Sequence, residues 1–209
     1  MTKDKRYFLL LGAFTFCFFV FFSFLVHKDL FTGLDFDTTV RLQNKISESF
    51  NTPFSILSLI GSFEIVSVIL LILWAITRKL RFIFVLLSFG LIHILELFGK
   101  VFVTHPGPPY LFFRYNIEFN FPTSYVQPGS SYPSGHAART AFISILLLLI
   151  VSKSKKLSGF QKKVIFSLVL LFDITMFVSR VYLGEHWLTD VLGGALLGAA
   201  FGLLSLILI

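Results

Sequence analysis

The sequence predicts an all-helical integral membrane protein, built as a bundle of six transmembrane helices. Of the 209 residues, 56% are hydrophobic and 14% are charged, and the mean hydropathy is +0.84. A soluble domain carries about 25% charged residues. The apolar residues are gathered into runs of about 20, the length that crosses a bilayer as a helix. The chain length suits one domain, which we expect to occupy residues 1–209.

Six apolar runs are long enough to span a membrane. They cover residues 7–26, 54–76, 82–103, 134–151, 164–182 and 187–209. The first run could be a signal peptide, but it is long for one and no small-residue cleavage site follows it, so we interpret it as a retained anchor. Residues 27–52 mix apolar and charged side chains. This pattern favours an amphipathic helix on the membrane surface, and it suits a connecting loop with a short helix equally well.

Basic residues are distributed unevenly between the two sides of the predicted bundle. Clusters precede the first run, follow the second and follow the fourth, and they hold eleven of the 18 lysines and arginines. The positive-inside rule therefore places both termini in the cytoplasm. Because this rule explains the net charge of +7, we do not expect nucleic-acid binding. The single cysteine, Cys17, excludes an intrachain disulfide.

This topology brings three polar segments to the outer face. Lys100 lies near the end of the third run, residues 134–136 begin the fourth, and residues 179–190 join the last two. Ionisable groups at a membrane boundary are costly unless they are paired or used. Since these segments are distant in sequence and meet at one depth, we expect them to form a site.

The last of these segments sets a histidine beside an acid. His186 and Asp190 are four residues apart, so on a helix the carboxylate lies within reach of the imidazole. Such a pair fixes the tautomer of the histidine and stabilises its charged form, which suits a nucleophile or a base. The alternative for this segment alone is a salt bridge between Arg180 and Asp190 at a helix boundary.

The segment that begins the fourth run is suited to phosphate. Pro133 and Ser134 are typical of the first turn and the cap of a helix, whose free N–H groups bind anions. Gly135 allows the backbone to approach a ligand closely, and His136 follows it into the same pocket. A capped helix with a polar end is the alternative, and it leaves His136 unexplained.

Together these segments offer the groups that phosphoryl transfer requires. They comprise two cations, hydroxyl and amide donors, two histidines and a carboxylate. No cluster of carboxylates suited to a metal ion is available at this face, so we expect neither a metal nor another cofactor. Cations and amides would hold the phosphate, one histidine would attack phosphorus, and the other would protonate the leaving oxygen.

Two motifs carry a family resemblance. They are Pro133-Ser134-Gly135-His136 and Ser179-Arg180, then five residues, His186, three residues and Asp190. This pattern resembles the phosphatidic acid phosphatase type 2 family, which includes lipid phosphatases and vanadium-dependent haloperoxidases. The resemblance implies that His186 is the nucleophile and forms a phosphohistidine, that Asp190 orients it, and that His136 is the general acid. The phosphate-binding residues that it implies are Lys100, Ser134, Gly135 and Arg180.

This sequence departs from the first motif of that family. The family has Lys, six residues, Arg and Pro, whereas Lys100 is followed at that spacing by Gly107 and Pro108. Losing one electrostatic contact of this kind costs about 10²–10³ in rate. Phosphate-ester hydrolases can accelerate their reactions by up to ~10²¹, so the loss weakens the case for activity without removing it.

Another cation could replace the missing arginine. The candidates are His105, Arg114 and Arg139. We prefer Arg139, because it lies three residues after His136 on nearly the same helix face. The alternative role for Arg139 is to pair with an acid, Glu185 or Glu96.

Other ionisable residues within the apolar runs have structural interpretations. We expect Glu96 to pair with Lys100 and His93 to be an interhelical hydrogen-bond partner. Asp173 lies about 10 Å deeper than the arginine of the second motif and is expected to be structural. Glu64 either lines the pocket or caps a neighbouring helix.

Small residues recur in the last run. Gly194, Gly198 and Gly202 repeat every four residues, a spacing that lets helices approach closely. We expect them to pack within the monomer, with a dimer face as the alternative. The oligomeric state stays open.

The expected function is that of a membrane phosphatase acting at the outer leaflet, with membrane lipids around it. Its substrate would be a lipid phosphate or diphosphate. The resemblance implies isoprenoid diphosphate, phosphatidylglycerophosphate, phosphatidic acid or a lipid A phosphate, and the sequence does not choose among them. A lipid phosphotransferase on the same scaffold and a non-catalytic relative remain as alternatives. A haloperoxidase is not expected, because the chain is membrane-embedded.

Overall fold

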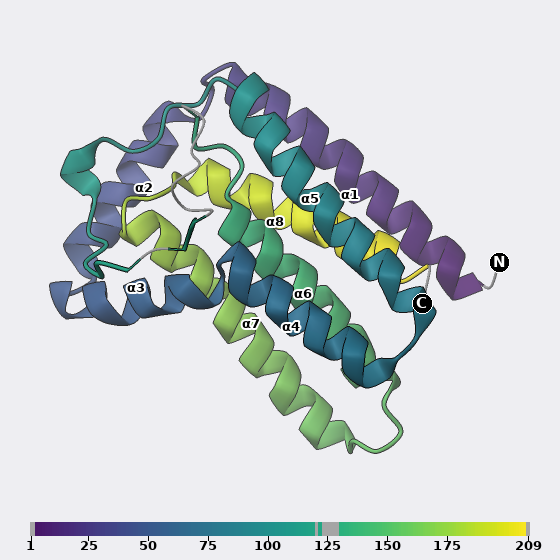
Figure 1. Ribbon diagram of the computed structural model, residues 1–209. Helices are drawn as coiled ribbons and strands as arrows, with labels where there is room; N and C mark the ends of the chain where they lie inside the picture. Colours follow the sequence, from purple (N-terminus) through teal and green to yellow (C-terminus); the bar gives the residue numbers. More distant parts are fainter. Residues whose placement is uncertain (1–2, 120, 123–129, 208–209) are drawn as a thin grey trace.

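The computed structural model describes residues 3–119, 121–122 and 130–207, and these form α-helices joined by 3-10 turns and loops (Figure 1). The α-helices are α1 Lys3–His27, α2 Thr32–Lys45, α3 Asn51–Ile60, α4 Phe63–Thr77, α5 Ile83–Phe102, α6 Gly135–Lys153, α7 Gly159–Tyr182 and α8 Leu188–Ser205. The 3-10 turns are Glu48–Phe50, Leu80–Phe82 and Tyr110–Phe112. The prediction of an all-helical fold is confirmed.

Five of the helices are long and apolar enough to cross a membrane, namely α1, α5, α6, α7 and α8. The pair α3 and α4 counts as a sixth span if it is taken as one broken helix, bent by 46°. The break lies at Gly61 and Ser62, inside the predicted second run. Glycine is a poor helix former, and the Ser62 hydroxyl accepts a hydrogen bond from the Ile65 N–H at the start of α4. These two residues therefore divide a run that hydropathy alone reads as continuous.

The core of the bundle is the contact between α6 and α8. An added Cβ on Gly194 would lie 2.2 Å from the Ser134 carbonyl oxygen, and one on Gly198 would lie 2.0 Å from the Ala138 carbonyl oxygen. The two backbones therefore touch without intervening side chains. Gly202 meets the Ile145 side chain on the same neighbour. The small residues of α8 thus pack within the monomer, as predicted.

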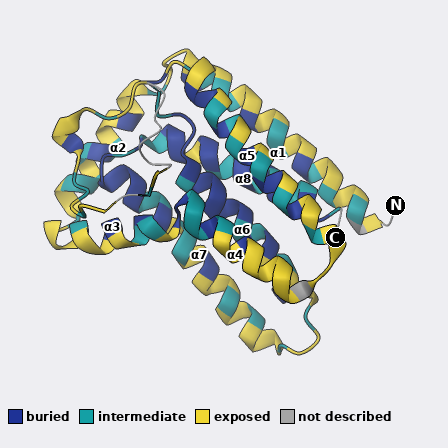
Figure 2. Cartoon of the chain, viewed as in Figure 1, coloured by how far each residue is buried: buried dark blue, intermediate teal, exposed yellow. Residues whose placement is uncertain are grey.

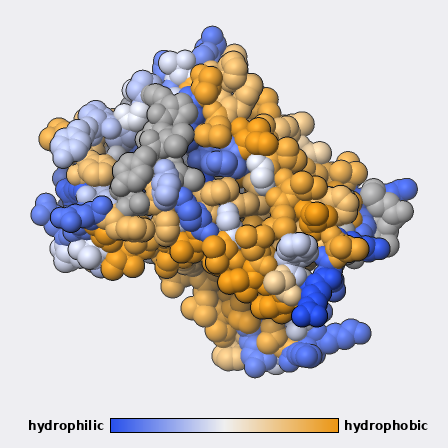
Figure 3. All heavy atoms as spheres, viewed as in Figure 1, coloured by the Kyte–Doolittle hydropathy of each residue, from blue (hydrophilic) through white to orange (hydrophobic). Residues whose placement is uncertain are grey.

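The outer faces of the helices are apolar. Buried residues concentrate on α6 and α8, while α1, α4 and α7 carry long exposed stretches (Figure 2). Apolar side chains form a broad band across the visible face, with hydrophilic side chains gathered at its two ends (Figure 3). A band of exposed apolar side chains is the surface that a bilayer covers.

The two ends of the bundle differ. Both termini lie at the end that carries the α4–α5 and α6–α7 connections, so the three basic clusters share this end (Figure 1). The opposite end carries α2 and α3. Within the segment predicted as amphipathic, α2 buries the polar side chains of Asp35 and Thr39 and exposes Leu34 and Phe36. This helix therefore turns polar groups inward, toward the end of the bundle where α7 stops and α8 begins.

Candidate active site

Helix ends from distant parts of the chain meet at the end of the bundle opposite the termini. The end of α5, the start of α6, the end of α7 and the start of α8 supply the predicted residues. The starts of α6 and α8 are joined by a backbone hydrogen bond, since the Ser134 N–H donates to the Asp190 carbonyl oxygen at 2.9 Å. The break between α3 and α4 closes the site from another direction. The three predicted polar segments are therefore brought together.

His186 and Asp190 lie beside each other where α8 begins. The Nδ1 atom of His186 is 3.4 Å from Oδ2 of Asp190, a long hydrogen bond. The same oxygen accepts the Trp187 N–H at 2.9 Å, so the carboxylate also caps the helix. Asp190 is fully buried and His186 is only 8% exposed. Because Nδ1 faces the acid, Nε2 is the ring nitrogen available to a substrate.

The other carboxylate oxygen of Asp190 binds a second histidine. Nδ1 of His105 lies 2.8 Å from Oδ1 of Asp190, and Nε2 of His105 lies 3.6 Å from Oδ2 of Asp35. Burial alone lowers the pKa of His105, but the hydrogen bond to Asp190 and the negative charges of Asp190 and Asp35 outweigh it and raise that pKa to about 9. His105, a candidate for the missing cation, is therefore a cation, but both of its ring nitrogens face carboxylates.

His136 stands in the first turn of α6, against the break between α3 and α4. Its Nε2 lies 3.5 Å from the Ser58 hydroxyl, and an added Cβ on Gly61 would be 3.0 Å from its ring. Ser134 caps the helix by accepting the Ala137 N–H. Ser58 and Gly61 were not identified from the sequence, because they lie inside an apolar run without a recognisable motif.

Arg180 is the most enclosed cation of the site. Its guanidinium is fully buried and donates to the Ser58 hydroxyl, the Ser179 hydroxyl and the Phe54 carbonyl oxygen. It also pairs with the carboxylate of Glu185. The salt bridge considered for this segment therefore involves Glu185, the neighbour of the histidine, in place of Asp190.

A second group of charges surrounds Glu96 on α5. The Arg139 guanidinium donates to this carboxylate at 2.9 Å, and the Lys100 ammonium lies 3.9 Å away, as predicted for that pair. Nδ1 of His93 lies 3.3 Å from it, so the hydrogen bond of His93 is within α5 rather than between helices, because Glu96 is less than one turn away. The carboxylate also reaches the start of α6, where an added Cβ on Gly135 would lie 2.0 Å from Oε1.

The remaining candidates have separate partners. Arg139 pairs with Glu96, which was its alternative role, and its Nε also donates to the Gly61 carbonyl oxygen at 3.0 Å. Its part as a substitute arginine stays a prediction. Arg114 lies over the Tyr182 ring and donates to its hydroxyl. Asp173 accepts a hydrogen bond from the Ser144 hydroxyl at 2.6 Å, which suits a structural residue.

Gly107, at the position of the missing arginine, is exposed. An added Cβ would lie 3.5 Å from Cβ of Ser131, an ordinary van der Waals distance. The neighbouring Pro106 carbonyl oxygen accepts a hydrogen bond from the Trp187 indole at 2.8 Å. The loop that follows α5 is therefore held beside the histidine of the second motif.

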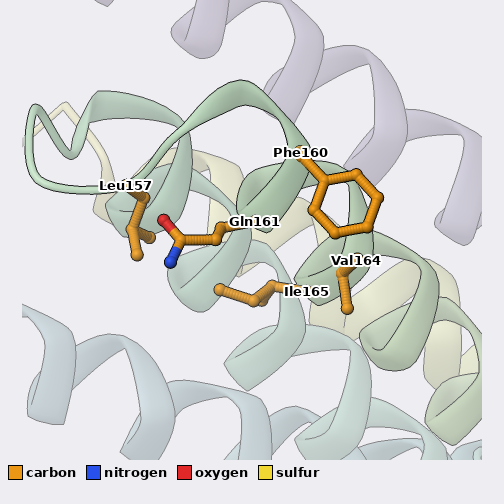
Figure 4. Close-up of a pocket in the computed structure, with 5 residues that line it drawn as sticks. All are labelled: Leu157, Phe160, Gln161, Val164 and Ile165. Carbon is orange, nitrogen blue, oxygen red and sulfur yellow. The ribbon is translucent and has the colours of Figure 1, made fainter.

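A hollow at the opposite end of the bundle has a different character. It is formed by the connection between α6 and α7 and the first turns of α7, and Figure 4 shows its lining. The lining residues are Leu157, Phe160, Gln161, Val164 and Ile165. None of these five is titratable, so the chemistry belongs to the helix ends described above.

The fold and the site together define the class of this protein. Residues 78–209 match the sequence profile of the PAP2 superfamily, and the chain belongs to that superfamily. The match covers α5 to α8 and therefore every residue of the three motifs. It does not include α1 to α3, which supply Asp35 and Ser58.

Solved structures share the fold. A transmembrane PAP2-type phosphatidylglycerolphosphate phosphatase from Bacillus subtilis aligns with a TM-score of 0.73 at 20% identity, over 94% of this chain and 93% of that one. LpxE from Aquifex aeolicus aligns with a TM-score of 0.62 at 24% identity, over 83% and 94%. The chain is a multi-pass membrane protein with the PAP2 transmembrane fold.

Curated relatives match over shorter segments. Phosphatidylglycerophosphatase B of Bacillus subtilis is 35% identical over 32% of this chain, and an undecaprenyl-diphosphatase of Sulfolobus acidocaldarius is 38% identical over 42%. A dihydrosphingosine 1-phosphate phosphatase of Saccharomyces cerevisiae is 34% identical over 32%. The aligned segments span 34%, 40% and 17% of those relatives.

Proposed function

We propose that this protein is a membrane phosphatase that hydrolyses a lipid phosphate or diphosphate through a phosphohistidine on His186. The observation that carries the proposal is the pairing of His186 with a buried carboxylate, 3.4 Å away, at the same helix-end site as His136 and Arg180. An imidazole held by an acid at one nitrogen is a nucleophile at the other. The surrounding cations suit a phosphate.

The first step would transfer the phosphoryl group to the enzyme. Nε2 of His186 attacks phosphorus with its lone pair, and the bond between phosphorus and the leaving oxygen breaks. His136 gives its proton to that oxygen, which leaves as the lipid alcohol or the lipid monophosphate. The positive charge that forms on the ring of His186 is stabilised by Asp190.

The second step would return the enzyme to its starting state. A water molecule attacks the phosphohistidine, and His136 accepts the proton that the water loses. The bond between nitrogen and phosphorus breaks, and inorganic phosphate departs. Lys100, Arg180 and the N–H groups at the start of α6 would hold the phosphate oxygens in both steps. The reaction requires no metal ion.

The position of the site favours a lipid substrate. It lies at the end of an apolar band, where a headgroup can enter while its tail stays in hydrocarbon. The names of the curated relatives share this chemistry, a phosphate or diphosphate on an apolar chain. The basic clusters at the opposite end favour an outward-facing site with both termini in the cytoplasm.

A phosphate-release assay tests the proposal. Purified protein in detergent is given phosphatidic acid, phosphatidylglycerophosphate, a lipid A phosphate and an isoprenoid diphosphate, with EDTA present and without an acceptor lipid. We expect release from at least one substrate, loss of release in His186→Ala, and retention of release in His27→Ala, which removes an exposed histidine of α1. Transfer only to an added lipid would favour a phosphotransferase, and no release from any substrate would favour a non-catalytic protein. Loss of activity in EDTA alone would contradict the metal-free mechanism.

A further inference from the structure

A chain of alternating acids and imidazoles extends from α2 to the nucleophile. It runs from Asp35 to His105 at 3.6 Å, from His105 to Asp190 at 2.8 Å, and from Asp190 to His186 at 3.4 Å. The four residues come from α2, the loop after α5, and the start of α8. Asp35 and Asp190 are 1% and 0% exposed. Two buried carboxylates around one imidazole would be costly unless the imidazole were charged.

Asp35, at the outer end of this row of four side chains, is anchored to α8, the helix that carries Asp190. Oδ1 of Asp35 accepts the backbone N–H of Thr189 at 2.9 Å, and Oδ2 accepts the Thr189 hydroxyl at 2.7 Å. Asp35 therefore contacts the first turn of α8 one residue before Asp190. The Asp35 carboxylate of α2 thus reaches Asp190 and His186 by two routes, through His105 and through the backbone of α8.

The backbone of His105 is held as firmly as its ring. Its N–H donates to the Ser130 hydroxyl at 3.1 Å, and its carbonyl oxygen accepts from the Ser131 N–H at 3.0 Å. Tyr132 packs edge-on against the ring, with centroids 6.4 Å apart. The groups that face His105 are thus Asp35 from α2, Asp190 from α8, and the phenol of Tyr132, whose pKa is raised by burial.

The protonation state of His105 determines the net charge of Asp35, His105 and Asp190 together. A neutral imidazole has a single N–H and can donate to one carboxylate, whereas the protonated ring donates to both. Protonated His105 cancels one of the two negative charges of Asp35 and Asp190. One negative charge remains for the cation that forms on His186. Without Asp35, the charge of His105 would cancel that of Asp190.

We propose that Asp35 and His105 are positioning residues of the catalytic site, a neutralising pair that fixes Asp190 while leaving its charge available to His186. The proposal rests on the phosphatase function proposed above. The segment of the first motif, between Lys100 and Gly107, would then also help to position His186, because His105 in this segment contacts Asp190. This positioning also depends on α2, which lies outside the segment matched by the superfamily.

Single charge removals provide the first test. Asp35→Asn keeps the size of the side chain and should lower kcat about tenfold with KM little changed, because less negative charge would remain to stabilise the cation that forms on His186. Asp37→Asn makes the same change two residues away on α2, where the side chain is exposed, and should leave both constants unchanged. Size-exclusion profiles and unfolding midpoints in detergent establish that each variant is folded.

A charge-matched double variant separates positioning from mere support of the fold. Asp35→Asn with His105→Gln removes one negative and one positive charge, and the glutamine amide can still donate to Asp190. We expect each single variant to be slow and the double variant to recover to within about threefold of wild type. Two purely structural residues would instead combine their losses, so a double variant slower than both singles would overturn the proposal.

The outcomes separate this proposal from the function on which it rests. A wild-type protein without activity on any lipid phosphate overturns both. An active wild type whose rate is unaffected by Asp35→Asn overturns the positioning role alone. If Asp35→Asn does not fold, His105→Gln alone and the double variant decide, since recovery of the double relative to His105→Gln is expected only if the two charges are coupled.

Discussion

At the residue scale, Gly107 is the clearest departure of this chain from its family pattern. The glycine is exposed, and an added Cβ makes only an ordinary contact with Ser131. An arginine is therefore sterically acceptable at this position. We expect Gly107→Arg to raise kcat/KM about tenfold or more, because a hydrogen bond to a charged group contributes about 1.5–3 kcal/mol.

The matched control for that variant is Gly33→Arg. Gly33 lies in α2, also exposed, and an added Cβ there meets no atom within 4 Å. This variant adds the same charge at the same end of the bundle. Equal gains in the two variants would indicate general attraction of an anionic lipid. No gain in Gly107→Arg would contradict the view that the site lacks a phosphate-binding cation at this position.

The raised pKa of His105 makes a prediction about stability. Its pKa rises from 6.5 to about 9 on folding, so the protonated form is favoured in the folded state. The stabilisation is fully present below about pH 6.5 and is lost as the pH rises through about 9. The unfolding midpoint of wild type should therefore exceed that of His105→Gln by most at low pH, with a difference that shrinks toward pH 9. A difference that is constant over this range would contradict a charged His105.

Local spacing predicted much of the site at this scale. The approach of His186 to Asp190 follows from four-residue spacing on a helix, and the Ser134 cap follows from its place before α6. The partners Asp35 and Ser58 could not be predicted in this way. Their contacts with Thr189 and Arg180 join residues more than 100 positions apart, and neither has a local motif.

At the element scale, the contact between α6 and α8 determines the geometry of the site. These two helices carry the proposed catalytic residues His136 and Asp190, and their backbones touch at Gly194 and Gly198. The repeat of small residues predicted a close approach. It could not identify α6 as the neighbour, because small-residue spacing carries no information about the partner helix.

We expect Gly198→Ala to destabilise the protein. The added methyl group would lie 2.0 Å from the backbone oxygen of Ala138, so the helices must separate. Overpacking of this kind costs about 1–3 kcal/mol, which corresponds to a fall of roughly 2–12 °C in the unfolding midpoint. The control is Gly90→Ala on α5, where an added Cβ meets no atom within 4 Å. Equal midpoints for the two variants would contradict a tight contact between α6 and α8.

The broken span formed by α3 and α4 was less accessible to sequence reasoning. Hydropathy averages over a window and therefore joins residues 54–76 into one run. The division at Gly61 and Ser62 depends on a hydroxyl cap and a glycine, which are weak signals within an apolar segment. The break matters for function, because the Gly61 carbonyl oxygen and the Ser58 hydroxyl both face the site.

At the scale of the whole molecule, composition and hydropathy were sufficient to predict the all-helical membrane fold. Apolar runs of about 20 residues leave few alternatives in a bilayer, where only helices and closed barrels satisfy the backbone. The inward orientation of Asp35 on α2 could not be predicted, since its buried partners His105 and Thr189 are distant in the sequence. An amphipathic pattern normally indicates an apolar inner face.

The orientation of the bundle is a further prediction at this scale. Single cysteines are introduced into a Cys17→Ser background at Leu111, which is 88% exposed in the turn near the site, and at Lys155 in the basic connection. With a membrane-impermeant maleimide on intact cells, we expect labelling of Leu111→Cys and none of Lys155→Cys until the cells are opened. The reverse pattern would show that the site faces the cytoplasm.

Trapping the covalent intermediate tests the proposed chemistry most directly. The protein is mixed with the lipid phosphate that it hydrolyses, quenched with alkali within the first turnover, and digested for mass spectrometry under conditions that preserve phosphohistidine. We expect phosphate on His186 in wild type and none in His186→Ala. Substrate turnover without a phosphorylated His186, or phosphate on another residue, would contradict the assignment of this histidine as the nucleophile.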